Sequence, residues 1–209
     1  MASPTTFPGD IVVAGNARIS GVITPAKDRD EILSIEERVM TLPWSLWRIW
    51  DNLAALPPVA AATDDLGLVP GTLGTNFPCV QSVDFGGTTT TAYIRAQIPV
   101  PADYVAGQSF KIRFHAGMLV VADTSCTLDI VCYKSDTENL VGADLASAAV
   151  ADNIKSATFA DVDFTITATS LSPGNFLDVR VSIVGTDVGN AAPLITAVIG
   201  LVQLVYNGR

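Results

Sequence analysis

The sequence predicts a mainly β protein: an antiparallel, jelly-roll-like β-sandwich preceded by an extended N-terminal arm and a short helical segment. Three observations support this fold class. Stretches of alternating apolar and polar residues, typical of strands that bury one face, recur throughout 77–209. Glycines spaced six residues apart divide the first 25 residues into short units. Between 26 and 56, apolar residues recur at helical spacing.

The arm, residues 1–25, contains Gly9, Gly15 and Gly21 with apolar residues between them. Each unit is typical of a short strand followed by a glycine turn. Three such units cannot bury a core by themselves. We therefore expect the arm to lie on a partner surface or to wrap around sister chains; a free tail is the alternative. The arm residues expected to contact the partner are Phe7, Ile11, Val13, Ile19 and Ile23.

Apolar residues in the helical segment, 26–56, follow one another at alternating steps of three and four from Ile32 to Leu56. This spacing indicates a heptad seam. Pro43 lacks a backbone donor and disfavours helical geometry at the residue before it. The segment therefore predicts two helices, 27–41 and 43–55, with a break between them.

The three tryptophans, Trp44, Trp47 and Trp50, lie beside this seam. Aromatic surfaces of this size are normally buried. Either the β-domain of the same chain or the same helix of other subunits would cover them, and the sequence leaves both open. The residues predicted to form an oligomer interface are Ile32, Ile35, Val39, Leu42, Leu46, Ile49, Trp50 and Leu53.

Proline, alanine and glycine mark 57–76 as a linker to the sandwich, 77–209. Alternation is clearest at Phe110, Ile112 and Phe114, which predict one buried face of a strand. The order of the strands in the sheets does not follow from the pattern. The predicted strands are 78–85, 90–99, 109–121, 125–135, 156–169, 175–185 and 194–206.

The net charge is −9, and the twelve Lys and Arg residues are scattered. A phosphate-binding surface needs grouped basic residues, so we expect no direct contact with nucleic acid. Charged residues make up only 16% of the chain and hydrophobic residues 49%. Such a low charge is typical of a protein that hides surface in an assembly; a sandwich rich in Val, Ala and Thr is the alternative.

Cys126 and Cys132 fall in one predicted strand, six residues apart. An extended chain separates them by roughly 20 Å, too far for a disulfide. With Cys79 they are predicted to be small buried side chains of a protein made in a reducing cytoplasm. The first residues lack the pattern of a signal peptide, and the longest apolar run, 194–202, is too short to span a bilayer. We expect no membrane association.

Catalytic and metal-binding patterns are weak in this sequence. His115 is the only histidine, and no G-x-S-x-G nucleophile elbow accompanies it. One histidine and three spaced cysteines do not supply a zinc site. Asp161 and Asp163 share a strand face, which is weak support for calcium. Phosphate-binding glycine loops are absent. We therefore expect no enzyme activity, no cofactor and no metal.

The segment FPGDIVVAGNARISGVITPAKDR, 7–29, resembles N-terminal segments of tailed-bacteriophage virion proteins. Pro8-Gly9, Gly15-Asn16, Gly21 and Thr24-Pro25 carry this likeness. Three later segments look like β-sandwich domains of phage head proteins: 98–107, 126–136 and 172–183. The resemblance implies a capsid decoration (cement) protein, generally trimeric, which binds neighbouring major capsid subunits. It transfers no catalytic residues.

Two functional hypotheses therefore stay open, and an enzyme is disfavoured. In the first, the chain decorates the outside of a virion as a homotrimer, with the arm on the major capsid protein, after synthesis in the host cytoplasm. In the second, it is a head or tail fibre component whose sandwich binds a receptor or host glycan. Exposed aromatic residues would serve glycan binding, and the candidates in the sandwich are Tyr93, Tyr104, Tyr133 and Tyr206.

Overall fold

A computed structural model describes residues 35–62, 64–71, 77–85, 89–121, 124–135, 142–146, 149–187 and 196–209. The chain divides into two units, Met1–Ser34 and Ile35–Arg209. The whole predicted arm, the first part of the predicted helical segment and the interface residue Ile32 lie outside the described residues. The arm residues Phe7, Ile11, Val13, Ile19 and Ile23 therefore stay predictions.

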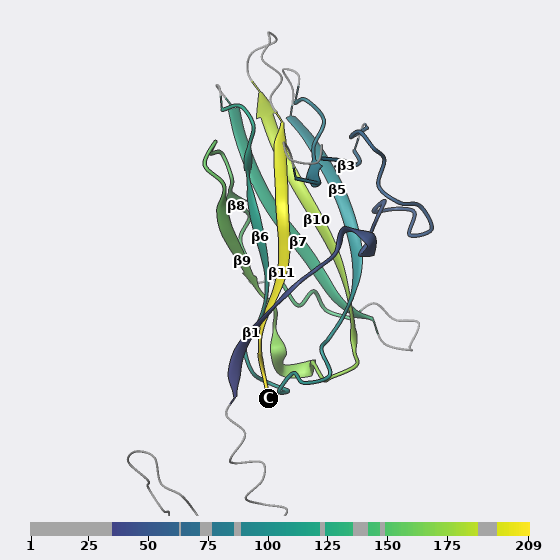
Figure 1. Cartoon of the computed structure of the whole chain (residues 1–209), viewed down its shortest axis with the longest axis vertical. Helices are drawn as coiled ribbons and strands as arrows, with labels where there is room; N and C mark the ends of the chain where they lie inside the picture. The colour runs from purple at the N-terminus through teal and green to yellow at the C-terminus, as the bar shows by residue number, and fades with distance from the viewer. Residues whose placement is uncertain are drawn as a thin grey trace, which may run out of the picture. The chain divides into compact units, whose positions relative to one another are not determined.

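The second unit is a sandwich of two antiparallel sheets (Figure 1). One sheet has the order β3-β4-β11-β6-β9, with β1 also paired to β11, and the other has the order β2-β5-β10-β7-β8. The bounds are β1 Glu36–Thr41, β2 Trp47–Arg48, β3 Gly67–Val69, β4 Cys79–Gln81, β5 Thr89–Pro99, β6 Phe110–Met118, β7 Thr124–Ser135, β8 Asp152–Asn153, β9 Ala160–Thr165, β10 Phe176–Asp187 and β11 Ala197–Gly208. Two 3-10 turns, η1 Trp44–Leu46 and η2 Ala168–Ser170, complete the elements.

The eight strands from β4 to β11 alternate between the sheets as β4-β11-β6-β9 and β5-β10-β7-β8. This is the strand order of a jelly roll, two Greek keys folded over one core. The predicted mainly β, jelly-roll-like sandwich is thus confirmed. Each of the seven strands predicted between 78 and 206 overlaps an observed strand.

The core lies between the facing sides of the two sheets. Every second residue of β10, from Leu177 to Ile183, has no exposed surface. Phe110, Ile112 and Phe114 of β6 face them from the other sheet and are equally buried. Burying one face of each strand removes apolar surface from water and fixes the register, because a shift by one residue would expose that face.

The prediction of two helices, 27–41 and 43–55, is wrong over the described residues. Residues 36–41 form β1, and 44–48 form one 3-10 turn followed by β2. Pro43 has extended backbone angles, φ −70° and ψ 147°. The segment gains strand partners that are distant in sequence: β1 pairs with β11 and β2 pairs with β5. The Leu42 amide also donates to the Val202 carbonyl at 2.9 Å.

The sandwich therefore begins before the predicted boundary at residue 77. β1 and β2 come from the predicted helical segment, and β3 comes from the predicted linker, 57–76. Trp47 is 1% exposed and belongs to the core, so the chain's own sandwich covers this tryptophan. Trp44 packs against the same core, 6.3 Å from Trp47 between ring centroids.

Cys126 and Cys132 are free thiols that point from β7 into the core, as predicted, whereas Cys79 is half-buried. Burial raises the pKa of both Cys126 and Cys132 to about 12, so both stay protonated at neutral pH. No helix in the described part of the chain is both long enough and apolar enough to span a bilayer.

Candidate functional site

Strand β1 is exposed on nearly its whole surface. Glu36 to Val39 are exposed and only Met40 is half-buried. Among the described strands, β11 is its only partner, with the register running from Glu36 opposite Gly208 to Thr41 opposite Gln203. Strands of a sandwich normally bury one face against the other sheet. β1 has little of this cover: Met40 packs against the core and Arg38 pairs with Asp103 on one face, and the face that carries Glu37 and Val39 is exposed.

Two of the predicted interface residues, Ile35 and Val39, are exposed apolar side chains at this strand, at 42% and 53%. They are four positions apart, so they share one side of the extended chain. Arg38 holds the strand in place through an ion pair with Asp103, Nη1 to Oδ2 at 2.7 Å. Tyr206 donates to the other oxygen of Asp103 at 3.1 Å.

The other predicted interface residues do not continue this surface. Leu42 is buried in the chain's own core at 3% exposure, and Leu46 packs against that core. Leu42 is therefore unavailable to a partner subunit, which corrects that part of the prediction. Ile49, Trp50 and Leu53 are half-buried. The predicted interface residues would share one side of a helix, but in a strand successive residues point to opposite sides, so they do not form one surface.

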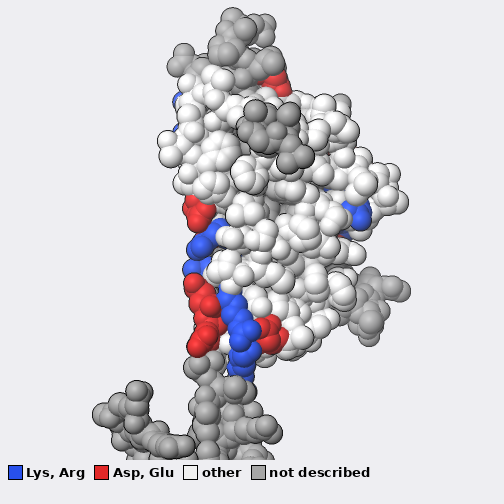
Figure 2. Space-filling view, in the orientation of Figure 1, with Lys and Arg blue, Asp and Glu red and all other residues white. Residues whose placement is uncertain are grey.

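A ladder of charged pairs joins β6 to β9. Arg113 donates from Nε and Nη2 to the two carboxylate oxygens of Asp163, at 2.6 and 2.9 Å. Lys111 lies 3.6 Å from Asp163, and His115 Nδ1 lies 2.8 Å from Asp161 Oδ1. In Figure 2, charged side chains gather over β1, β6 and β9, and the rest of this face is mostly uncharged.

This ladder changes the interpretation of Asp161 and Asp163, which had weak support as calcium ligands. Asp163 pairs with Lys111 and Arg113, and Asp161 lies 3.8 Å from Arg113 and within hydrogen-bond distance of His115. Among the described residues, no group of His, Cys, Asp and Glu is arranged to hold a metal ion. The two aspartates therefore stabilise a strand pair.

Replacing Arg113 by glutamine is expected to make stability less dependent on acid pH. The hydrogen bond from Arg113 lowers the pKa of Asp163 from 3.8. A lowered pKa in the folded state contributes stability above pH 3.8 that is lost as the pH falls through the folded value. For a partly exposed pair we expect about 0.5–1 kcal/mol. Urea unfolding at pH 7 and pH 2.5 measures it: wild type and Arg113→Gln should differ at pH 7 and converge at pH 2.5. A constant difference would contradict this assignment.

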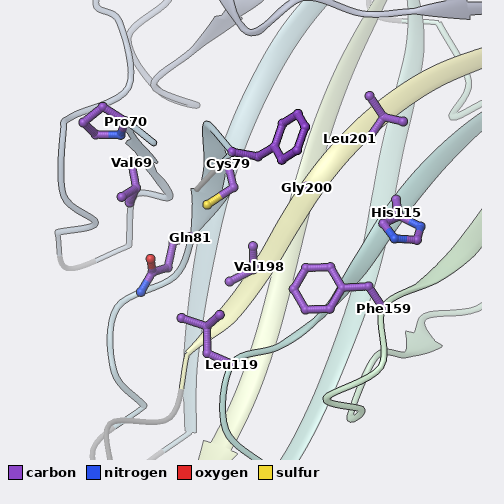
Figure 3. A pocket seen from close by; sticks show the side chains of 11 residues that line it. Val69, Pro70, Cys79, Gln81, His115, Leu119, Phe159, Val198, Gly200 and Leu201 are labelled. Carbon is purple, nitrogen blue, oxygen red and sulfur yellow. The ribbon is translucent and has the colours of Figure 1, made fainter. Parts of the chain in front are cut away.

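A hollow of about 570 Å³ lies on the outer face of the six-stranded sheet (Figure 3). Apolar side chains dominate its lining, among them Phe77 and Leu119, which are 87% and 57% exposed. The lining residues are Val69, Pro70, Phe77, Cys79, Gln81, His115, Leu119, Phe159, Val198, Gly200 and Leu201.

Cys79 and His115 both line this hollow without forming a nucleophile–base pair. Cys79 is on β4 and His115 is on β6, with β11 between them. Two strand spacings, about 10 Å, separate them. Burial raises the pKa of the Cys79 thiol, whereas a nucleophilic cysteine needs a lowered one. The hollow is an apolar surface feature without a chemical centre.

A second cluster lies on the outer face of the five-stranded sheet. The Arg180 guanidinium is 5.2 Å from the Tyr93 ring centroid and 5.7 Å from that of Trp50, and the two rings are 4.9 Å apart. Beside it, Arg95 binds Asp178 through two hydrogen bonds, one of 2.6 Å from Nε. We call Trp50, Tyr93, Arg95, Asp178 and Arg180 the arginine–aromatic cluster.

Sequence reasoning found only part of this cluster. Tyr93 is one of the aromatic candidates named from the sequence, and it is half-buried on the outward side of β5. Arg95 lies on the same side and was not named. Trp50 was assigned to a helix outside the sandwich, yet it lies on the sheet next to Tyr93. Tyr133 is also half-buried, whereas Tyr104 and Tyr206 are buried at 3% and 6% exposure. The last two are therefore poor candidates for glycan binding.

No protein-family model matches the chain, and no curated protein matches it. The chain has similarity to a solved structure described as the xylan-binding module CBM15, at 14% identity and a TM-score of 0.45, covering 82% of this chain and 97% of that one. The CBM22-1 xylan-binding domain from Paenibacillus barcinonensis Xyn10C is similar at 7% identity and 0.40, covering 78% and 94%.

A structure of the infectious bursal disease virus Gx strain is similar at 14% identity and a TM-score of 0.34, covering 84% of this chain and 33% of that one. At these identities and TM-scores the similarities carry no functional argument.

Proposed function

We propose that this chain is a structural protein of a bacteriophage head: a capsid decoration protein that binds the major capsid protein through its N-terminal residues and displays the jelly roll. The observation that carries the proposal is the division of the chain at Ser34. The described residues beyond it build two complete sheets around one core. The residues before it include 7–29, which resemble N-terminal segments of phage virion proteins.

Extended arms suit attachment to a protein shell. A segment that adds a strand to a neighbouring sheet forms main-chain hydrogen bonds along a whole edge. Linking several arms in one oligomer raises their effective concentration at the shell, so that weak contacts add up to stable attachment. A homotrimer satisfies this requirement. Its interface includes Ile35 and Val39, the exposed apolar residues of β1 and its start.

A binding role without catalysis agrees with the chemistry of the described residues. His115 is engaged by Asp161, and burial disfavours the thiolate of Cys79. The pairs of Asp163 with Lys111 and Arg113 hold two strands together, and none of these three residues lines the hollow. The proposed protein binds its partners and catalyses no reaction.

Electron microscopy of purified particles of the phage that encodes this chain tests the proposal. We expect density for the jelly roll on the outer surface of the head, at positions where several copies meet. Native mass spectrometry of the purified protein is expected to give three times the 21.9 kDa of one chain. Density at the tail alone would favour the fibre reading, and a strict monomer at micromolar concentration would remove the trimer.

Replacing Val39 by aspartate is expected to dissociate the oligomer without unfolding the sandwich. The side chain is 53% exposed in the single chain, so a charge costs the monomer little. In an apolar interface, the same charge loses its hydration without a partner. Native mass spectrometry and urea unfolding measure the two effects. Val150→Asp is the matched control because this valine is 80% exposed elsewhere on the sandwich. Equal effects of the two variants on assembly would exclude β1 from the interface.

A further inference from the structure

We propose that the arginine–aromatic cluster binds a carboxylated sugar, a uronic acid or a sialic acid within a glycan. The proposal concerns the sandwich alone and does not require the attachment to a phage head. Its central group is Arg180, on the middle strand of the five-stranded sheet. Trp50 and Tyr93 provide the aromatic surface beside it.

The donors of Arg180 have no acceptor among the described residues, which also place no carboxylate in an ion pair with it. A guanidinium carries five N–H donors in a planar arrangement that matches the two oxygens of a carboxylate. Cation–π contacts with Trp50 and Tyr93 restrain the guanidinium without using its N–H donors. A group held in this way loses little further conformational freedom when it binds an anion.

The neighbouring arginines are already engaged. The strand register places Arg48, Arg95 and Arg180 side by side across β2, β5 and β10. Arg95 is neutralised by Asp178, and Arg48 donates to the carbonyl oxygens of Ser45 and Trp47 at 2.6 and 2.7 Å. Like charges directly opposite each other destabilise a sheet. Asp178 offsets the charge of Arg95 in this row, and Asp64 lies at the Trp50 indole. Arg48 and Arg180 have no carboxylate partner among the described residues, so an anionic ligand at Arg180 would stabilise the row.

The surroundings of Arg180 favour a sugar over a simple anion. Trp50 and Tyr93 are half-buried, and the apolar C–H face of a pyranose ring packs on aromatic rings of this kind. Ser182, Gln97 and Tyr133 point to the same outer face and offer hydroxyl and amide groups to sugar hydroxyls. Because all three lie on strands, the rigid sheet keeps these groups in fixed positions.

The alternative role of the cluster is structural. Trp50 belongs to the segment after β2, its indole nitrogen lies 3.4 Å from Asp64, and Arg95 reaches the Trp50 carbonyl at 3.4 Å. The cluster thereby fastens this segment to the sheet. A purely structural cluster would lower stability when altered and would bind no saccharide. The experiment therefore measures binding and stability separately.

Isothermal titration calorimetry of the full-length chain tests the proposal with two acidic probes, a galacturonic acid trisaccharide and 3′-sialyllactose. Their neutral counterparts are a galactose trisaccharide and lactose. We expect at least one acidic probe to bind about tenfold more tightly than its counterpart, which is the size of a charge-assisted contact. Which of the two acidic probes binds shows whether the site prefers a uronic acid or a sialic acid. Equal binding of acidic and neutral sugars, or none, would overturn the proposal.

Two variants assign the binding to Arg180. Arg180→Gln is expected to lose about tenfold in affinity, and Arg180→Lys, which keeps the charge without the planar donors, to lose less. Arg113→Gln, on the other sheet, is the control and should bind as wild type. The indole N–H resonance of Trp50 supplies a readout in the unaltered chain and should shift when the acidic probe is added. Wild-type affinity in a folded Arg180→Gln, or an unmoved Trp50 resonance, contradicts the assignment.

Discussion

Replacing Trp47 by alanine is expected to lower the free energy of unfolding by about 3–5 kcal/mol, the usual cost of removing a large aromatic side chain from a core. Trp47 is 1% exposed and is among the largest fully buried side chains of the chain. It stands opposite Ala96 on β5, where a small neighbour leaves room for the indole. Urea unfolding of the two proteins, followed by circular dichroism, measures the difference.

Trp47→Phe separates packing from hydrogen bonding at the same position. The indole nitrogen of Trp47 is buried without a hydrogen-bond partner among the described residues, and such a donor costs about 1–3 kcal/mol. Phenylalanine retains most of the ring and removes the donor, so we expect a much smaller loss than for alanine. If Trp47→Ala kept full stability and only dissociated an oligomer, the tryptophan would belong to a subunit interface and not to the core.

The long strands of the sandwich follow from local sequence because each of them buries one face. Alternation is clear in 109–115, 125–135 and 175–185. β6, β7 and β10 lie within two residues of their predicted ends, apart from the C-terminal end of β6. A period of two requires no knowledge of the neighbouring strand. The strand order depends on which faces and edges match across the whole chain, and alternation carries no such information.

Residues 36–48 show where this reasoning fails. Their apolar spacing fits a helix, but β1 and β2 gain strand partners in β11 and β5, which lie far along the chain, and Leu42 and Trp47 gain burial in the core. Strand formation depends on such neighbours more than on local preference. The pairing of β1 with residues 203–208 cannot be read from either segment alone.

The residues of the candidate glycan site were also only partly predictable from the sequence. The outward direction of Tyr93 and Arg180 follows from alternation in β5 and β10. The approach of Trp50 to Tyr93, and the alignment of Arg48 with Arg95, depend on the placement of the segment after Pro43. Local sequence thus identifies single members of the cluster, while the register between strands brings them together.

Removal of residues 1–34 is expected to abolish attachment to the phage head while leaving the sandwich folded. The described residues from Ile35 onward contain both sheets and the core, and the chain divides at this point. We therefore expect the free energy of unfolding to change by no more than about 0.5 kcal/mol, as for changes away from a core. The proposal assigns attachment to the removed residues, since a segment that adds a strand to a neighbouring sheet binds through main-chain hydrogen bonds along its length.

Sedimentation of particles lacking the protein, mixed with either the full chain or residues 35–209, measures this attachment. The full chain should sediment with the particles and the shortened chain should stay in solution. Ile11→Asp in the full chain is the matched variant because it keeps the length and places one charge in the predicted contact; it should weaken attachment. Equal sedimentation of the shortened and full chains would move the capsid contact to the sandwich, where the apolar hollow beside Phe77 and Leu119 would be the surface to alter next.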